Sequence, residues 1–174
     1  MLMKLALRNL LLHRSKSIIV GILMAAPSAW ADQQLSIQYD IPDIDARKYH
    51  RPYVAIWIET ADREPVQTIS LLKKKPKSSR KKNKLLDDLT QWWRATGKET
   101  VDELDGVTGA TRGPGTYSTN ISVPDGSDWV ILFEAVREKG GRSFIKQKIN
   151  SIPAAGITLP SKAEIGPITL TLVD

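Results

Sequence analysis

The chain has 174 residues, with 25 Lys and Arg against 19 Asp and Glu, a formal net charge of +6. The positive excess is local, because residues 1–31 and 73–84 together hold 12 of the basic residues and no acidic residue. The rest of the chain is net acidic, which argues against a general nucleic-acid binder. With no cysteine and two histidines, the chain excludes disulfides, thiolate metal sites and a multi-histidine metal site.

The first 31 residues have the organisation of a secretory signal peptide. A basic start precedes an apolar run of about ten residues, 17–26, which is shorter than the roughly 20 residues of a membrane span. Residues 29–31 (AWA) fit a signal peptidase site, so we predict cleavage after Ala31 and export to the periplasm. An uncleaved anchoring helix is the alternative, because residues 5–12 are also mostly apolar.

Seven segments of the remaining 143 residues have the patterns of β-strands. They are 35–41, 53–58, 66–72, 117–123, 129–136, 142–149 and 168–172. Residues 53–58 and 129–136 are almost continuously apolar, which is typical of central strands. Gly140 and Gly141 predict a two-residue hairpin turn. We therefore expect one all-β domain over 32–174, an immunoglobulin-like antiparallel β-sandwich.

One amphipathic helix, over about residues 84–96, is predicted to interrupt the strands. Apolar side chains recur along it at a spacing of four: Leu85, Leu89 and Trp93. Asn83 is a suitable N-cap, and Gly97 is expected to end the helix. Because neighbouring residues on a helix point in different directions, we expect Trp93 in the core and Trp92 at its partly exposed boundary.

A Gly-rich segment between this helix and the next strand, residues 105–115 (DGVTGATRGPG), carries the clearest functional pattern. It predicts an irregular, accessible loop in which Gly109 can adopt a positive φ and Ala110 adds little bulk. Such a loop offers the Thr111 hydroxyl to a large partner, and Arg112 could neutralise a phosphate held there. The alternative is an ordinary turn that Thr111 caps.

Five positions of this segment resemble the covalent flavinylation motif Asp-x-x-(Ser/Thr)-Gly-Ala-(Ser/Thr) of FMN-binding domains in bacterial respiratory complexes. They are Asp105, Thr108, Gly109, Ala110 and Thr111. In that family an FMN transferase takes FMN from FAD, with Mg²⁺, and joins its phosphate to the last Thr or Ser. The resemblance implies that Thr111 is the FMN acceptor and that the transferase recognises the other four residues.

Several segments are also similar to the predicted periplasmic proteins of domain-of-unknown-function family 2271: 52–70, 92–93, 107–115, 133–141 and 165–170. The resemblance implies a small exported domain encoded near flavin transferases and near membrane proteins with peptidase-propeptide-like domains. The resemblance implies that the protein is an electron carrier with a membrane redox partner rather than an enzyme in its own right. Flavin suits this role because it carries one or two electrons. A cofactor-free interaction or accessory module is the alternative, because sandwiches host many roles.

The basic run 73–84 has two interpretations. It is either a solvated loop or a surface that contacts anionic lipid or an acidic redox partner; nucleic acid is disfavoured because export removes that target.

The aromatic residues and the remaining charged residues have mainly structural interpretations. Trp92, Trp93 and Tyr117 could stack on a flavin ring, but packing is the simpler role for each. Trp57 and Trp129 are expected in the core, and His50 in a solvated loop. An exposed strand end is the expected position of Glu134, Arg137 and Glu138. We do not expect a catalytic carboxylate pair among them.

Overall fold

The computed structural model describes residues 33–74, 88–97, 104, 106–123 and 128–173. The predicted signal peptide, Asn83, Asp105 and most of the basic run lie outside these residues. The chain separates into two units, Met1–Trp30 and Ala31–Asp174, and all described residues belong to the second. No helix within the described ranges has the length and apolar character needed to cross a membrane.

Nine strands and three short helical segments make up the described part of the chain. The strands are β1 (Gln34–Ile41), β2 (Tyr53–Glu59), β3 (Pro65–Lys73), β4 (Thr108–Ala110), β5 (Gly115–Ser122), β6 (Val130–Val136), β7 (Arg142–Lys148), β8 (Ile157–Leu159) and β9 (Ile168–Val173). The helical segments are α1 (Thr90–Trp92), the π-helix η2 (Trp93–Gly97) and the 3-10 helix η3 (Ile149–Ser151). All seven predicted strands are confirmed, whereas β4 and β8, of three residues each, are too short to leave a sequence pattern.

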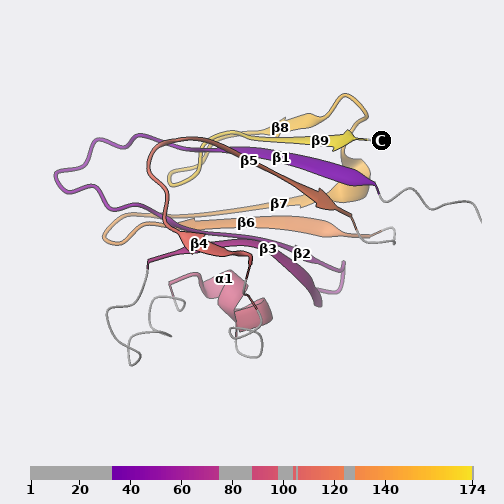
Figure 1. Ribbon diagram of the computed structural model, residues 1–174, viewed down its shortest axis with the longest axis horizontal. Helices are drawn as coiled ribbons and strands as arrows, with labels where there is room; N and C mark the ends of the chain where they lie inside the picture. The colour runs from indigo at the N-terminus through magenta and orange to yellow at the C-terminus, as the bar shows by residue number, and fades with distance from the viewer. Residues whose placement is uncertain (1–32, 75–87, 98–103, 105, 124–127, 174) are drawn as a thin grey trace, which may run out of the picture. The chain divides into compact units, whose positions relative to one another are not determined.

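The strands form two stacked sheets (Figure 1). One has the order β5-β1-β9-β8 and the other the order β4-β3-β2-β6-β7. All neighbouring strands are antiparallel except β3 and β4, because the chain passes through the helical segments after β3 and returns in the same direction. The predicted all-β sandwich is confirmed, and the parallel β4 is the departure from a purely antiparallel arrangement.

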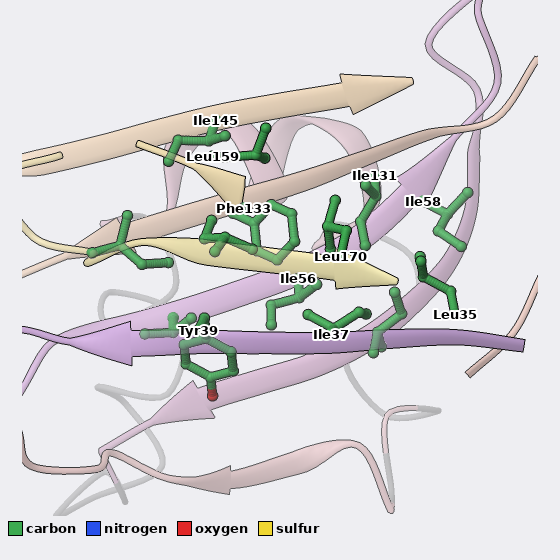
Figure 2. Packing of buried hydrophobic residues seen from close by; sticks show 14 of the residues in the cluster. Leu35, Ile37, Tyr39, Ile56, Ile58, Ile131, Phe133, Ile145, Leu159 and Leu170 are labelled. Carbon is green, nitrogen blue, oxygen red and sulfur yellow. The ribbon is translucent and has the colours of Figure 1, made fainter. Parts of the chain in front are cut away.

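The main core lies between the two sheets (Figure 2). On β1 the side chains of Leu35, Ile37 and Tyr39 point inward, while the residues between them are half-buried or exposed. Ile56 and Phe133 from the facing sheet complete this layer. The burial of such side chains, at about 25 cal/mol for each Å² of apolar surface, is the main source of stability in a fold without disulfides.

A second apolar cluster covers the outer face of the five-stranded sheet, where α1 packs (Figure 1). Leu89 and Trp92 lie against outward-pointing side chains of β2, among them Trp57. Both faces of β2 are therefore covered, so all seven of its residues are buried. This double coverage explains why residues 53–58 are continuously apolar.

The helix differs from its prediction in start and orientation. Within the described residues α1 begins at Thr90, although the predicted end at Gly97 is confirmed by η2. The assignment of the tryptophans is wrong: Trp92 is completely buried and Trp93 half-buried. The reason is that Leu89 and Trp92, three residues apart, share the face that contacts the sheet. The indole nitrogen of Trp92 also donates a hydrogen bond to Thr68 Oγ1 at 3.1 Å.

Glu134 on β6 explains where α1 begins. It was expected at an exposed strand end, but it is fully buried. Its carboxylate accepts the backbone N–H groups of Gln91 and Trp92 at 3.0 and 2.9 Å, and Arg142 Nε lies 3.5 Å away. Burial raises the pKa of Glu134, and the N–H groups and Arg142 lower it in part. The carboxylate thus satisfies N–H groups that a first helical turn leaves without intrahelical partners.

Candidate functional site

The motif segment lies at the edge of the five-stranded sheet. Residues Thr108–Ala110 form β4, which pairs with Leu71–Lys73 of β3, and Thr111 follows directly. The prediction of an irregular loop over 105–115 is therefore wrong for these three residues, because the neighbouring edge of β3 takes up their backbone groups. The Thr108 hydroxyl donates a hydrogen bond to Leu104 O at 3.0 Å, so this side chain serves the local structure.

Position 109 requires a glycine because of a neighbouring side chain, and not because of the positive φ that the sequence suggested. Its φ is not positive; the positive values in this segment belong to Gly106 and Gly115, at 97° and 144°. A Cβ placed on Gly109 would lie 3.1 Å from Leu72 Cδ2 on the adjacent strand, which is closer than ordinary packing allows. Glycine at this position lets β4 pack closely on β3.

The loop between β4 and β5 is attached to the sandwich through Tyr117. The Tyr117 hydroxyl donates to Gly113 O at 2.8 Å, and its ring lies 5.9 Å from the Tyr39 ring. The Arg112 guanidinium lies over the Tyr117 ring, 4.7 Å from its centroid, which is the geometry of a cation–π contact. The loop that carries Thr111 is therefore anchored without use of the Thr111 side chain.

Two cavities flank this segment, and Thr111 and Arg112 contribute to different ones. A cavity of about 290 Å³ is lined by Arg112 together with Thr108 and Gly109 of β4. Thr111, which is half-buried, lines a cavity of about 210 Å³. The remaining residues of that smaller cavity, called the Thr111 cavity below, are Tyr49, His50, Arg51, Tyr53, Lys74 and Glu138.

The Thr111 cavity contains the histidine that sequence reasoning placed in a solvated loop. His50 is half-buried, and its Nδ1 lies 3.4 Å from Glu138 Oε2. Two buried polar atoms, His50 Nε2 and the Tyr49 hydroxyl, have no hydrogen-bond partner among the described residues. Burial raises the pKa of Tyr49 above its ordinary 10.0, with Arg137 offsetting part of the effect, so the phenol is neutral at neutral pH.

Glu138 is held toward His50 by a structured turn between β6 and β7. The Arg137 side chain binds the buried Glu164 carboxylate at 2.8 and 3.2 Å, and Gly141 N–H donates to the same carboxylate at 2.6 Å. The predicted two-residue hairpin at Gly140 and Gly141 is therefore wrong: the turn spans residues 137–141, with Lys139 at a φ of 60°. Glu164 stabilises this longer turn by binding both of its ends.

The three aromatic residues that could stack on a flavin ring lie in different parts of the molecule. Trp92 is enclosed in the outer cluster, and Trp93 packs beside it with 6.4 Å between ring centroids, both on the face of the sheet covered by α1. Tyr117 lies next to the motif segment, although Arg112 and Tyr39 already contact its ring. Only Tyr117 of the three adjoins the loop that carries Thr111. Trp57 is core as expected, and Trp129 is partly buried against the main core.

Fold and site define a class: an all-β sandwich whose sheet edge presents a threonine beside a small cavity with charged and aromatic side chains in its lining. Residues 34–167 match the family described as predicted periplasmic protein, DUF2271. The match covers most of the chain, so the protein belongs to this family of predicted periplasmic proteins. Neither a curated protein nor a solved structure matches the chain.

Proposed function

We propose that this protein is an exported flavoprotein that carries FMN covalently on Thr111 and exchanges electrons with a membrane redox partner. The observation that carries the proposal is the position of Thr111: it ends a segment that resembles the flavinylation motif at every specified position, and it lies half-buried at a sheet edge beside a cavity with charged side chains in its lining. A motif threonine inside the main core would be out of reach of a modifying protein. Membership of a predicted periplasmic family is consistent with export.

The residues present are compatible with the attachment chemistry. The Thr111 oxygen would form a bond to the phosphorus of the FMN half of FAD. The bond from that phosphorus to the oxygen that bridges the two phosphates would break, AMP would leave, and the Thr111 proton would pass to a base. An alkyl hydroxyl needs such a base, which an external transferase or a neighbouring side chain can provide.

The chain's own contribution is to display and hold the attachment point. The β3–β4 pairing fixes Thr108 to Ala110, and the bonds of Tyr117 fix the loop that follows, so Thr111 is placed by structure on both sides. A flavin attached here would supply one- and two-electron chemistry, which suits a link between pairwise donors and single-electron acceptors. Attachment also retains the cofactor after export.

The proposal includes two segments that lie wholly or mostly outside the described residues. We propose that residues 1–31 direct export and are removed after Ala31. We propose that the basic run 73–84, which begins at the end of β3, contacts anionic lipid head groups or an acidic redox partner. Its first residue, Lys73, pairs with Ala110 of β4, so the run starts beside the segment that carries Thr111.

Co-expression in a periplasm with and without an FMN transferase tests the proposal. The intact mass of the wild type should rise by one FMN less one water only beside the transferase, and flavin fluorescence should stay with the denatured protein. Thr111→Ala should abolish both signals and Thr111→Ser should keep them. Thr116→Ala, at an exposed threonine outside the motif and outside the Thr111 cavity, serves as a matched threonine control. If the wild type stays unmodified beside a transferase that modifies its own substrates, a cofactor-free accessory module is the better account.

A further inference from the structure

We propose that the Thr111 cavity is a phosphate-binding site formed by the chain's own side chains, and that it holds the phosphoryl group esterified to Thr111. The identity of that phosphate rests on the proposed function, whereas the affinity of the cavity for a phosphate does not. The side chains that carry the inference are Tyr49, His50, Arg51 and Lys74.

Two cationic side chains line the cavity from positions just outside two different strands. Lys74 follows β3, and Arg51 precedes β2. Arg51 also lies beside the motif loop, since a Cβ on Gly113 would be 3.9 Å from its Nε. Ammonium and guanidinium groups are the common protein partners of phosphate oxygens, and guanidinium can bind two oxygens at once.

The two unpartnered polar atoms point to a missing hydrogen-bond partner. Buried polar atoms in folded proteins are almost always hydrogen-bonded, so His50 Nε2 and the Tyr49 hydroxyl call for an explanation. A phosphate oxygen accepts from a tyrosine hydroxyl and from a protonated imidazole. Both atoms belong to residues that line the Thr111 cavity, and a phosphate bound there becomes their partner once the two side chains turn toward it.

The single acidic residue of the cavity lining is oriented toward His50. Glu138 Oε2 lies 3.4 Å from Nδ1, which directs the Nδ1–H toward the carboxylate and leaves Nε2 without a partner among the described residues. In the neutral ring, Nε2 is then the acceptor that can take the Thr111 proton as the Oγ–phosphorus bond forms and AMP leaves. Once protonated, the same atom donates to the new phosphodiester.

The size of the cavity selects a small group. Its volume of about 210 Å³ lies below the roughly 300–1,000 Å³ of pockets that enclose a drug-sized ligand. A cavity of this volume can hold the phosphoryl group and the start of its sugar chain better than it can hold the whole cofactor. The ring system would then lie outside, where a redox partner can reach it.

Titration of the unmodified protein with inorganic phosphate at constant ionic strength tests the binding site. The histidine ring resonances report on it by NMR, because the chain has only two histidines and His50→Gln identifies the relevant signal. We expect a saturable shift of the His50 signal. Lys74→Ala combined with Arg51→Ala should weaken phosphate binding about tenfold or more, as expected for the loss of charge-assisted hydrogen bonds.

The matched control removes one lysine and one arginine elsewhere. Lys148 and Arg47 are exposed and do not line the cavity, so Lys148→Ala combined with Arg47→Ala should leave phosphate binding unchanged. An absent or non-saturable shift of His50, or equal weakening in both double variants, would overturn the phosphate site. Arg51 and Lys74 are themselves exposed, so their variants should fold even if a His50 variant does not.

The rate of FMN uptake beside a transferase separates this inference from the proposed function. His50→Gln should slow the initial rate by about a hundredfold if Nε2 accepts the Thr111 proton. If the wild type gains FMN but binds no phosphate, and the His50 and the Arg51–Lys74 variants gain FMN at the wild-type rate, the inference fails and the function stands. If phosphate binds but no FMN is gained, the function fails and the site stands.

Discussion

The centre and the edge of the five-stranded sheet are built in opposite ways. At the centre, β2 is covered on both faces and every residue in it is buried. At the edge, β4 has three residues, all exposed or half-buried, held by one parallel neighbour. The buried acids Glu134 and Glu164 have several partners each, whereas two polar atoms of residues that line the Thr111 cavity have no hydrogen-bond partner in the described part of the chain. Stability is concentrated at the centre, which leaves the edge available for chemistry.

The largest loss of stability is expected from the outer cluster. Trp92→Ala removes a completely buried indole and its hydrogen bond to Thr68, and should lower the free energy of unfolding by about 4 kcal/mol. Trp93→Ala, which removes a half-buried ring from the adjoining η2, should lower the free energy of unfolding clearly less. Urea denaturation checks both. An equal loss in the two variants would contradict the orientation of α1 described above.

A somewhat smaller loss is expected from the helix anchor. Glu134→Ala leaves the buried N–H groups of Gln91 and Trp92 without their acceptor, and should lower the free energy of unfolding by about 3 kcal/mol. Glu138→Ala is the matched control, because Glu138 is partly exposed and its loss should change the stability little. Amide exchange at Gln91 and Trp92 should rise in the Glu134 variant alone.

The close packing of β4 on β3 predicts an effect of intermediate size on stability. Gly109→Ala forces Leu72 or β4 to shift and should lower the free energy of unfolding by about 1 kcal/mol. Gly113→Ala provides the control, since its Cβ would meet its nearest neighbour only at 3.9 Å. Thermal denaturation of the pair measures the difference, and a neutral Gly109→Ala would show that β4 is not held against Leu72.

The raised pKa of Glu134 gives a weaker, pH-dependent prediction. Because burial raises this pKa above its ordinary 4.5, the folded state holds the Glu134 proton more tightly than the unfolded state. Its contribution to stability is full below pH 4.5 and declines as the pH rises through the folded-state pKa. The stability of wild type relative to Glu134→Gln should therefore fall from pH 4 to pH 7. A difference that stays constant or rises would contradict the assigned shift.

The smallest effect on stability is expected at the proposed attachment point. Thr111→Ala should change the free energy of unfolding by less than about 0.5 kcal/mol, because the loop is anchored through Tyr117. The same substitution should remove all covalent flavin. A large loss of stability would mean that Thr111 serves the fold, and the contrast between centre and edge would disappear.

The sequence predicts the centre of this molecule better than its edge. Alternation in β1 and continuous apolar runs in β2 and β6 follow directly from one or two covered faces, so these strands could be predicted. The three residues of β4 carry no such pattern, because their pairing depends on where β3 lies. The sequence predicts that Gly109 is needed for a positive φ. The structure instead shows that the neighbouring Leu72 side chain leaves little room for a Cβ, and the residues around Gly109 in the sequence do not indicate this contact.

The candidate site could be predicted only in part for the same reason. The motif identifies Thr111 from neighbouring residues, but His50 and Glu138 come to its cavity from distant parts of the chain. Likewise, the sequence predicts a strand-end acid at Glu134, and its role follows only from the contact with α1. The sequence marks His50 only as the one histidine beyond residue 31. That observation does not indicate which residues lie next to it in the fold.

The intact mass of the protein purified from its own periplasm tests the central claim most directly. We predict a chain that begins after Ala31 and carries one FMN less one water, with the added mass located at Thr111 by fragmentation. A mature chain without added mass, from cells that flavinylate other proteins, would contradict the account.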